Sequence, residues 1–162
     1  MTIQRIVAKI EEIILRPHVE YGIQTLKQNN SLHAQMLADA ITDAFHQHFT
    51  EEELQWFSKI EQVRNDLNDS TEIISITDYG AHAKNGMEVI TRSVGKTSRI
   101  SSKSERWLIV LFSIIRRFAP QRCIELGTCL GISTMYQSAA LTLNGVGNIV
   151  TLEGAQSLAD TP

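Results

Sequence analysis

A strand–turn–helix–strand pattern near the end of the chain constrains the fold most. Residues Cys123–Gly131 read Cys-Ile-Glu-Leu-Gly-Thr-Cys-Leu-Gly, which predicts a buried strand that ends in a glycine turn and opens a helix. Residues Ile149–Glu153 read Ile-Val-Thr-Leu-Glu and predict a second strand that ends in a carboxylate. Strands joined by a helix are expected to be parallel neighbours, with a right-handed crossover. The glycine turn and the acid then meet at one edge of the sheet, where α/β proteins bind ligands.

The first part of the chain is predicted to be helical throughout. Apolar residues recur at helical spacing, which predicts helices over 3–15, 19–28 and 32–48. Pro17 is expected to end or restart the first of these helices. Thr50 and Glu53 form a capping-box pattern that opens a fourth helix with Phe57 and Ile60 on its apolar face.

The middle of the chain differs from the helical region in residue composition and in predicted secondary structure. Residues 73–78 are β-branched and predict a strand, whereas residues 81–104 are polar and basic and predict a long loop. Ser102 and Glu105 form a second capping-box pattern before an apolar helix that Pro120 ends. The predicted fold class is therefore α/β, with a helical region over residues 1–70. Residues 71–162 are predicted to form the opening βαβ unit of a Rossmann-like sheet.

The composition of the chain limits which classes of binding partner are expected. The 162 residues carry a formal net charge of −3, which favours neither nucleic-acid nor membrane-surface binding. We identify no secretory signal and no apolar run long enough to cross a bilayer. Cys123 and Cys129 are expected to be reduced thiols in a cytoplasmic protein, with neither a disulfide nor a zinc site.

The turn itself predicts a cofactor site. Gly127 permits a sharp turn, and Gly131 lets the following helix begin close to a bound molecule. Glu153, at the tip of the second strand, is placed to accept both hydroxyls of a ribose, and Glu125 needs a donor that a ligand ammonium would supply. The alternative is a tight turn with two solvated strand ends. Cys129 stands inside the turn, which disfavours a nicotinamide-dependent oxidoreductase.

These residues also carry a family resemblance. Arg122–Tyr136 and Val150–Gly154 resemble the first two motifs of the class I S-adenosylmethionine-dependent methyltransferases, and in particular a bacterial O-methyltransferase-like branch that reads "ELGTSLGIST" and "TLEG". Upstream, Asp78–Ala83 is similar to that branch's "DFGAGS" segment, with His82 and Ala83 departing from it. The resemblance extends over residues 60–159. It implies a methyltransferase that uses S-adenosyl-L-methionine. Nothing visible in the sequence requires a metal, and we expect a small-molecule methyl acceptor that the sequence does not identify.

The resemblance also implies a role for each residue of the turn. Glu125, Gly127 and Gly131 would line the methionine and sugar part of the cofactor. Thr128 and Cys129 would contribute backbone groups in the same turn.

Three further residues follow from the same comparison. Glu153 would hold the ribose hydroxyls, and Gly154 would leave space beside the adenine. Ser133 would reach the methionine carboxylate, or else cap the helix. The catalytic residues stay unassigned; a weaker acid–base candidate is the group Asp78, Tyr79 and His82.

A complete class I sheet has further strands, and this sequence holds none after Pro162. We therefore expect the first part of such a domain, either as a fragment or as a chain that a partner completes. The rival hypothesis is a non-catalytic homologue that acts as a protein-interaction module. Homo-oligomers are expected, through the open sheet edge or through apolar helices.

Overall fold

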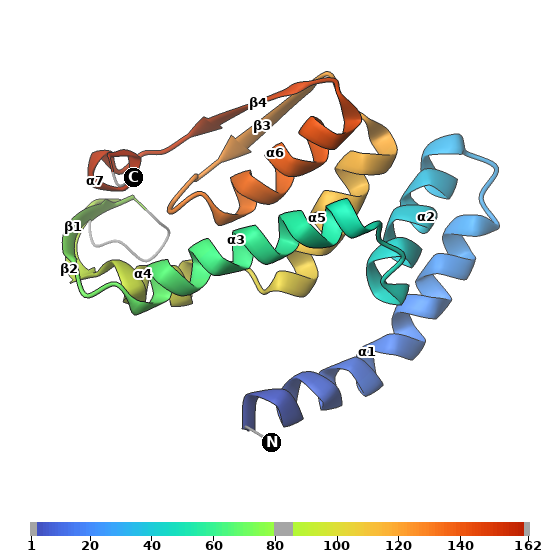
Figure 1. Cartoon of the computed structure of the whole chain (residues 1–162), viewed down its shortest axis with the longest axis horizontal. Helices are drawn as coiled ribbons and strands as arrows, with labels where there is room; N and C mark the ends of the chain where they lie inside the picture. Colours follow the sequence, from blue (N-terminus) through green and yellow to red (C-terminus); the bar gives the residue numbers. More distant parts are fainter. Residues whose placement is uncertain (1–2, 80–85, 161–162) are drawn as a thin grey trace.

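The computed structural model describes residues 3–79 and 86–160, with side chains described from Leu15 onward (Figure 1). The helices of this part are α1 (Ile3–Lys27), α2 (Leu32–His46), α3 (Glu51–Asp69), α4 (Val94–Ser101), α5 (Glu105–Phe118), α6 (Ile132–Asn144) and α7 (Gln156–Ala159). The strands are β1 (Ile73–Asp78), β2 (Glu88–Ser93), β3 (Arg122–Leu126) and β4 (Asn148–Leu152). Helices combined with small sheets are what the predicted α/β class requires.

The strand–turn–helix–strand prediction is confirmed in the arrangement of β3, α6 and β4. The two strands pair in parallel, from Arg122 opposite Asn148 to Leu126 opposite Leu152, and α6 connects them. Figure 1 shows α6 running alongside the strand pair, with α3 and α5 beyond it. The two strands therefore end at the same edge, and the turn before α6 leaves that edge.

The prediction of a long loop over residues 81–104 is wrong from Glu88 to Ser101, where the chain forms β2 and α4. β2 pairs antiparallel with β1, and α4 follows it directly. The side chain of Ser93 caps α4 by accepting the N–H of Lys96 at 3.1 Å. The strand was missed because its partner, β1, supplies the hydrogen bonds that a polar segment needs to stay extended. Residues 80–85 lie outside the described part, and His82 with them.

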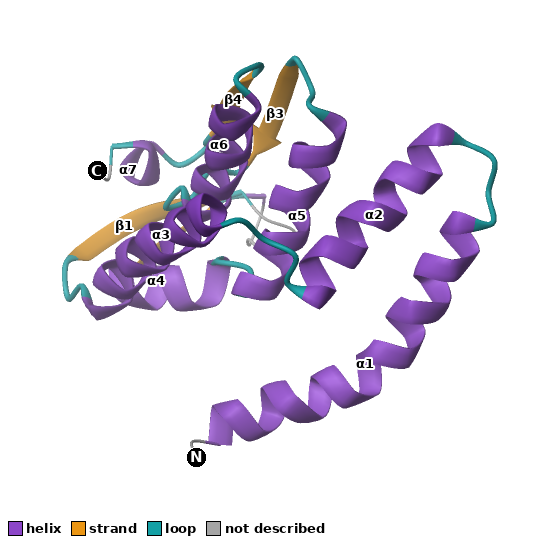
Figure 2. Ribbon diagram, turned by 45° about the vertical axis from the view of Figure 1, so that its right-hand side comes forward, coloured by secondary structure: helices purple, strands orange, loops and turns teal. Residues whose placement is uncertain are grey.

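Two helix boundaries also differ from the prediction. α1 continues through Pro17 instead of ending there, and Figure 2 shows its axis bending along its length. A proline removes one helical hydrogen bond and kinks the axis, but the turns on either side persist. The N-cap of α5 is Ser104 and not Ser102, without a side-chain cap. The capping box of Thr50 and Glu53 is confirmed at the start of α3.

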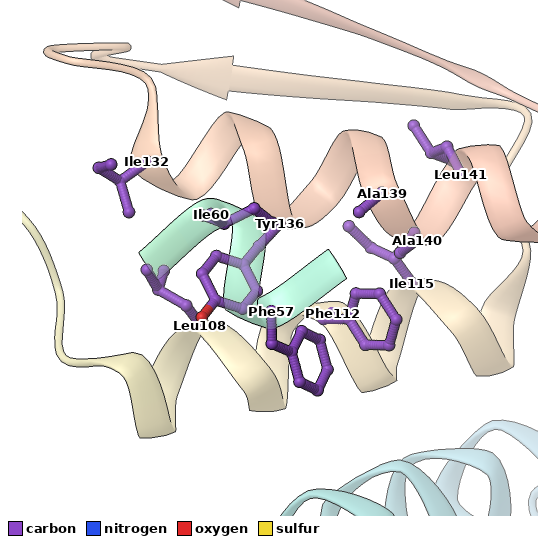
Figure 3. Close-up of a cluster of buried hydrophobic side chains, with 10 residues drawn as sticks. All are labelled: Phe57, Ile60, Leu108, Phe112, Ile115, Ile132, Tyr136, Ala139, Ala140 and Leu141. Atoms are coloured by element: carbon purple, nitrogen blue, oxygen red, sulfur yellow. The ribbon is translucent and has the colours of Figure 1, made fainter. Parts of the chain in front are cut away.

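The main core joins α3, α5 and α6 (Figure 3). Phe57 of α3 packs edge-to-face on Phe112 of α5, with ring centroids 4.7 Å apart, and stacks on Tyr136 of α6 at 5.6 Å. The Tyr136 hydroxyl, buried in this core, donates to Glu61 at 2.9 Å. Burial, together with the nearby Glu61 carboxylate, raises the pKa of Tyr136 above its ordinary value. The phenol therefore stays a hydrogen-bond donor, and both predicted regions contribute to one core.

The β3–β4 sheet is covered on one face only, so the prediction of buried strands is half wrong. Apolar side chains of high exposure project from the uncovered face: Ile124 (72%), Leu126 (78%), Val150 (53%) and Leu152 (56%). Trp107 is 54% exposed because α5 buries its opposite side. The exposed apolar side chains of this sheet face are the physical motive for the predicted self-association.

We expect Phe112→Ala to lower the free energy of unfolding by about 3–5 kcal/mol, because the change empties the centre of the aromatic cluster. Trp107→Ala, on the exposed side of the same helix, is the matched control and should cost about 1 kcal/mol or less. Urea denaturation of the two variants measures both values. Equal losses would contradict the assignment of the core to this side of α5.

We expect the chain to self-associate through the uncovered sheet face. The double variant Ile124→Lys with Val150→Glu places opposite charges on register partners and leaves the net charge unchanged. It should shift the protein toward a monomer, because desolvating two charges opposes burial of that face. Light scattering coupled to size exclusion measures the mass, with Tyr21→Ser on α1 as an exposed control. A wild-type chain that is monomeric at all concentrations would contradict this expectation.

Candidate functional site

In the turn between β3 and α6, three residues adopt a backbone conformation with positive φ, which glycine adopts more easily than other residues. Gly127, Cys129 and Gly131 have φ angles of 87°, 50° and 75°. The N–H of Gly127 donates to the carbonyl of Leu152 at 2.8 Å, which ties the turn to the end of β4. A Cβ atom added at Gly127 or Gly131 would meet no atom within 4 Å. The glycines therefore serve the backbone angle and leave open space beside the turn.

Glu153 follows β4 and holds this turn directly. One carboxylate oxygen accepts the N–H of Cys129 at 2.7 Å, and the other accepts the N–H of Ala155 at 2.9 Å. These bonds explain why a half-buried carboxylate is stable at this position. A carboxylate has about four acceptor positions, so both oxygens keep lone pairs for further donors. The predicted meeting of acid and glycine turn is thus present in the structure.

Glu125 of β3 obtains its donors from within the chain. Its carboxylate accepts from the hydroxyl of Thr134 and from the side-chain amide of Gln137 at 2.8 Å, both on α6. Glu125 needs a donor, as expected, and α6 supplies two, so a ligand ammonium is not required to satisfy it. The sequence analysis missed these two partners. Thr134 lies in the first turn of α6 and Gln137 in the second, and a helix that packs on β3 places such residues above the strand.

Two cavities flank the turn. The α7-side cavity has a volume of about 480 Å³ and is lined by Thr128, Cys129, Leu130, Gly131, Thr134, Met135, Ser138, Thr151, Glu153, Leu158 and Ala159. The α4-side cavity has a volume of about 210 Å³ and is lined by Ser101, Ser102, Lys103, Glu125, Leu126, Gly127, Thr128, Cys129, Leu130, Ile132 and Ser133. The turn thus separates a larger space beside Glu153 from a smaller space beside Glu125.

The structure brings together seven of the eight predicted site residues along these two cavities, all except Gly154. A Cβ atom at Gly154 would lie 3.7 Å from the ring of Tyr79, so this glycine leaves room next to an aromatic side chain. Ser133 lies in the first turn of α6, where N–H groups have no helical acceptor. The helix has no side-chain cap, so Ser133 does not cap it.

Cys129 is a half-buried thiol at the centre of the site. Burial raises its pKa above the ordinary value, and the Glu153 carboxylate adds to this effect. A hydrogen bond with Ser101, another with Leu130 and the nearby Arg92 act in the opposite direction. The thiol therefore stays protonated at neutral pH. Its contact with Ser101 also shows that the C-terminal end of α4 touches the turn, which the predicted loop did not indicate.

We expect Gly131→Ala to fold with a free energy of unfolding lowered by about 1–2 kcal/mol, because alanine is strained at a positive φ while the space around it is open. Gly131→Asn should cost less, since asparagine tolerates this backbone region. Thermal or urea denaturation measures both variants. A loss that is larger for asparagine than for alanine would show that space, and not backbone angle, limits this position.

Comparison with protein-family models, with curated proteins and with solved structures finds no match to this chain. Within its described residues, no helix is long and apolar enough to cross a membrane. The function proposed below is therefore supported by the geometry of the turn and by the motif resemblance.

Proposed function

We propose that the chain binds S-adenosyl-L-methionine at the turn between β3 and α6 and belongs to a class I methyltransferase. The observation that carries this proposal is the contact between the Glu153 carboxylate and the backbone of the glycine turn. A parallel strand pair with a glycine turn and a carboxylate together at its carboxyl edge is the arrangement by which Rossmann-like sheets hold a ribose next to a helix N-terminus. The β3–α6–β4 unit is, on this proposal, the opening of such a sheet.

The size and the lining of the α7-side cavity support this proposal. The α7-side cavity, at about 480 Å³, lies in the range of about 300–1,000 Å³ that ligand pockets occupy. Met135 and Leu158 give it an apolar wall for a base, and the remaining lone pairs of Glu153 accept ribose hydroxyls. The open space next to Gly131 lets a ligand approach the backbone of the turn.

On this proposal, the protein contributes to methyl transfer mainly by positioning the methyl donor and the acceptor. S-adenosyl-L-methionine supplies an electrophilic methyl group when bound, and the residues around the turn fix where that group lies. A fixed geometry of this kind contributes by holding the two reactants in line. The methyl acceptor on this proposal is a small molecule, and none of the described side chains is assigned as its base.

Glu153→Ala is expected to weaken binding of S-adenosylhomocysteine about ten- to a hundred-fold, the loss of about 1.5–3 kcal/mol for a charge-assisted contact. Titration calorimetry on the wild type and the variant measures this change. Asp160→Ala, which removes an exposed carboxylate just after α7, is the control and should bind as the wild type does.

Because Glu153 also holds the turn, the melting temperature of each variant is measured alongside. A folded Glu153→Ala protein with wild-type affinity would remove Glu153 from the site. A wild-type protein with no affinity for S-adenosylhomocysteine would overturn the proposed function itself.

A second candidate function is a non-catalytic module for protein–protein contact. The uncovered face of Ile124, Leu126, Val150 and Leu152 favours it, since exposed apolar patches of this kind mark interaction sites. The two candidates differ in ligand binding: the module predicts self-association or partner binding without affinity for S-adenosylhomocysteine.

A further inference from the structure

The α4-side cavity has a chemical character that the turn residues alone do not explain. It is small, about 210 Å³, and its lining includes both Glu125 and Lys103. Lys103 comes from the connection between α4 and α5, more than twenty residues upstream of Glu125. The lining of this cavity therefore combines one basic and one acidic residue with Ser133 of α6.

Lys103 is held in place through its backbone, which leaves its ammonium available. Its carbonyl accepts from the guanidinium of Arg64 at 2.9 Å, and Arg64 is itself paired with Glu61 at 2.9 Å. The side chain of Lys103 is exposed and makes no ion pair with a described residue. An anchored backbone with a charged side chain at the rim of a cavity is suited to contact a charged ligand.

Glu125 supplies the opposite charge. Its two oxygens each accept one bond from α6, from Thr134 and Gln137, and each oxygen keeps an acceptor position. On the same side, the first-turn N–H groups of α6 near Ser133 favour an anion. An ammonium beside Glu125 and a carboxylate between Lys103 and Ser133 would satisfy all of these groups. The zwitterionic head of an α-amino acid carries this pair of charges.

We propose that Lys103 binds the carboxylate of the ligand's amino-acid portion and selects ligands that carry this portion over uncharged nucleosides. The inference rests on the proposed function, because it assigns the two ends of one ligand to the two cavities. The nucleoside end lies in the α7-side cavity and the amino-acid end in the α4-side cavity. Lys103 is a binding residue on this proposal, and no step of the methyl transfer passes through it.

The test compares two probes that differ in the amino-acid portion. S-adenosylhomocysteine carries the zwitterionic head, and 5′-methylthioadenosine lacks it. Titration calorimetry measures both on the wild type, on Lys103→Met and on Lys103→Arg. Lys96→Met is the matched control, because Lys96 is an exposed lysine on α4 and its loss changes the net charge equally.

Lys103→Met should bind S-adenosylhomocysteine about ten- to a hundred-fold more weakly, as expected for the loss of a charge-assisted contact. Its affinity for 5′-methylthioadenosine should equal that of the wild type. Lys103→Arg should retain most of the wild-type affinity, and the effect of Lys103→Met should shrink as salt is added.

Wild-type affinity of Lys103→Met for S-adenosylhomocysteine, or an equal loss for both probes, would overturn the assignment of Lys103 and leave the proposed function standing. A wild-type chain that binds neither probe would overturn the proposed function and this inference with it.

Discussion

The edge-to-face contact between Phe57 and Phe112 is the interaction on which the rest of the structure depends. It joins α3 to α5, and Tyr136 stacks on Phe57 to bring α6 into the same core. Since α6 covers one face of the β3–β4 pair, the aromatic cluster also fixes the strands. A two-stranded sheet is marginal alone, so the position of the turn depends on the helical core more than on strand pairing.

The carboxylates of Glu153 and Glu125 stabilise the turn itself, and this structural role affects how they could bind a ligand. Glu153 holds the backbone at Cys129 and Ala155, and Glu125 accepts from Thr134 and Gln137. Both are therefore oriented before any ligand arrives, which lowers the entropy that binding would otherwise cost. Each still lines a cavity, so one carboxylate can hold the turn and contact a ligand through its remaining lone pairs.

The candidate site was predictable where its residues are close in sequence. The motif residues Gly127, Cys129 and Gly131 adopt the backbone angles that a sharp strand-to-helix turn requires. Glu153 was placed correctly at the tip of the next strand, because parallel strands of equal length end together. The approach of Ser101 and Lys103 to the turn was not predictable, since only the packing of α4 on α3 brings them there.

By itself the sequence determined the strands at Arg122–Leu126 and Asn148–Leu152, the turn between them and the capping box of Thr50 and Glu53. These features depend on residues a few positions apart, whose preferences act locally. Tertiary structure alone decided that β2 forms against β1 and that one face of the β3–β4 sheet is uncovered. Strand pairing and side-chain burial depend on residues that are distant in the chain. Local preferences do not specify which distant segment a strand pairs with or packs against.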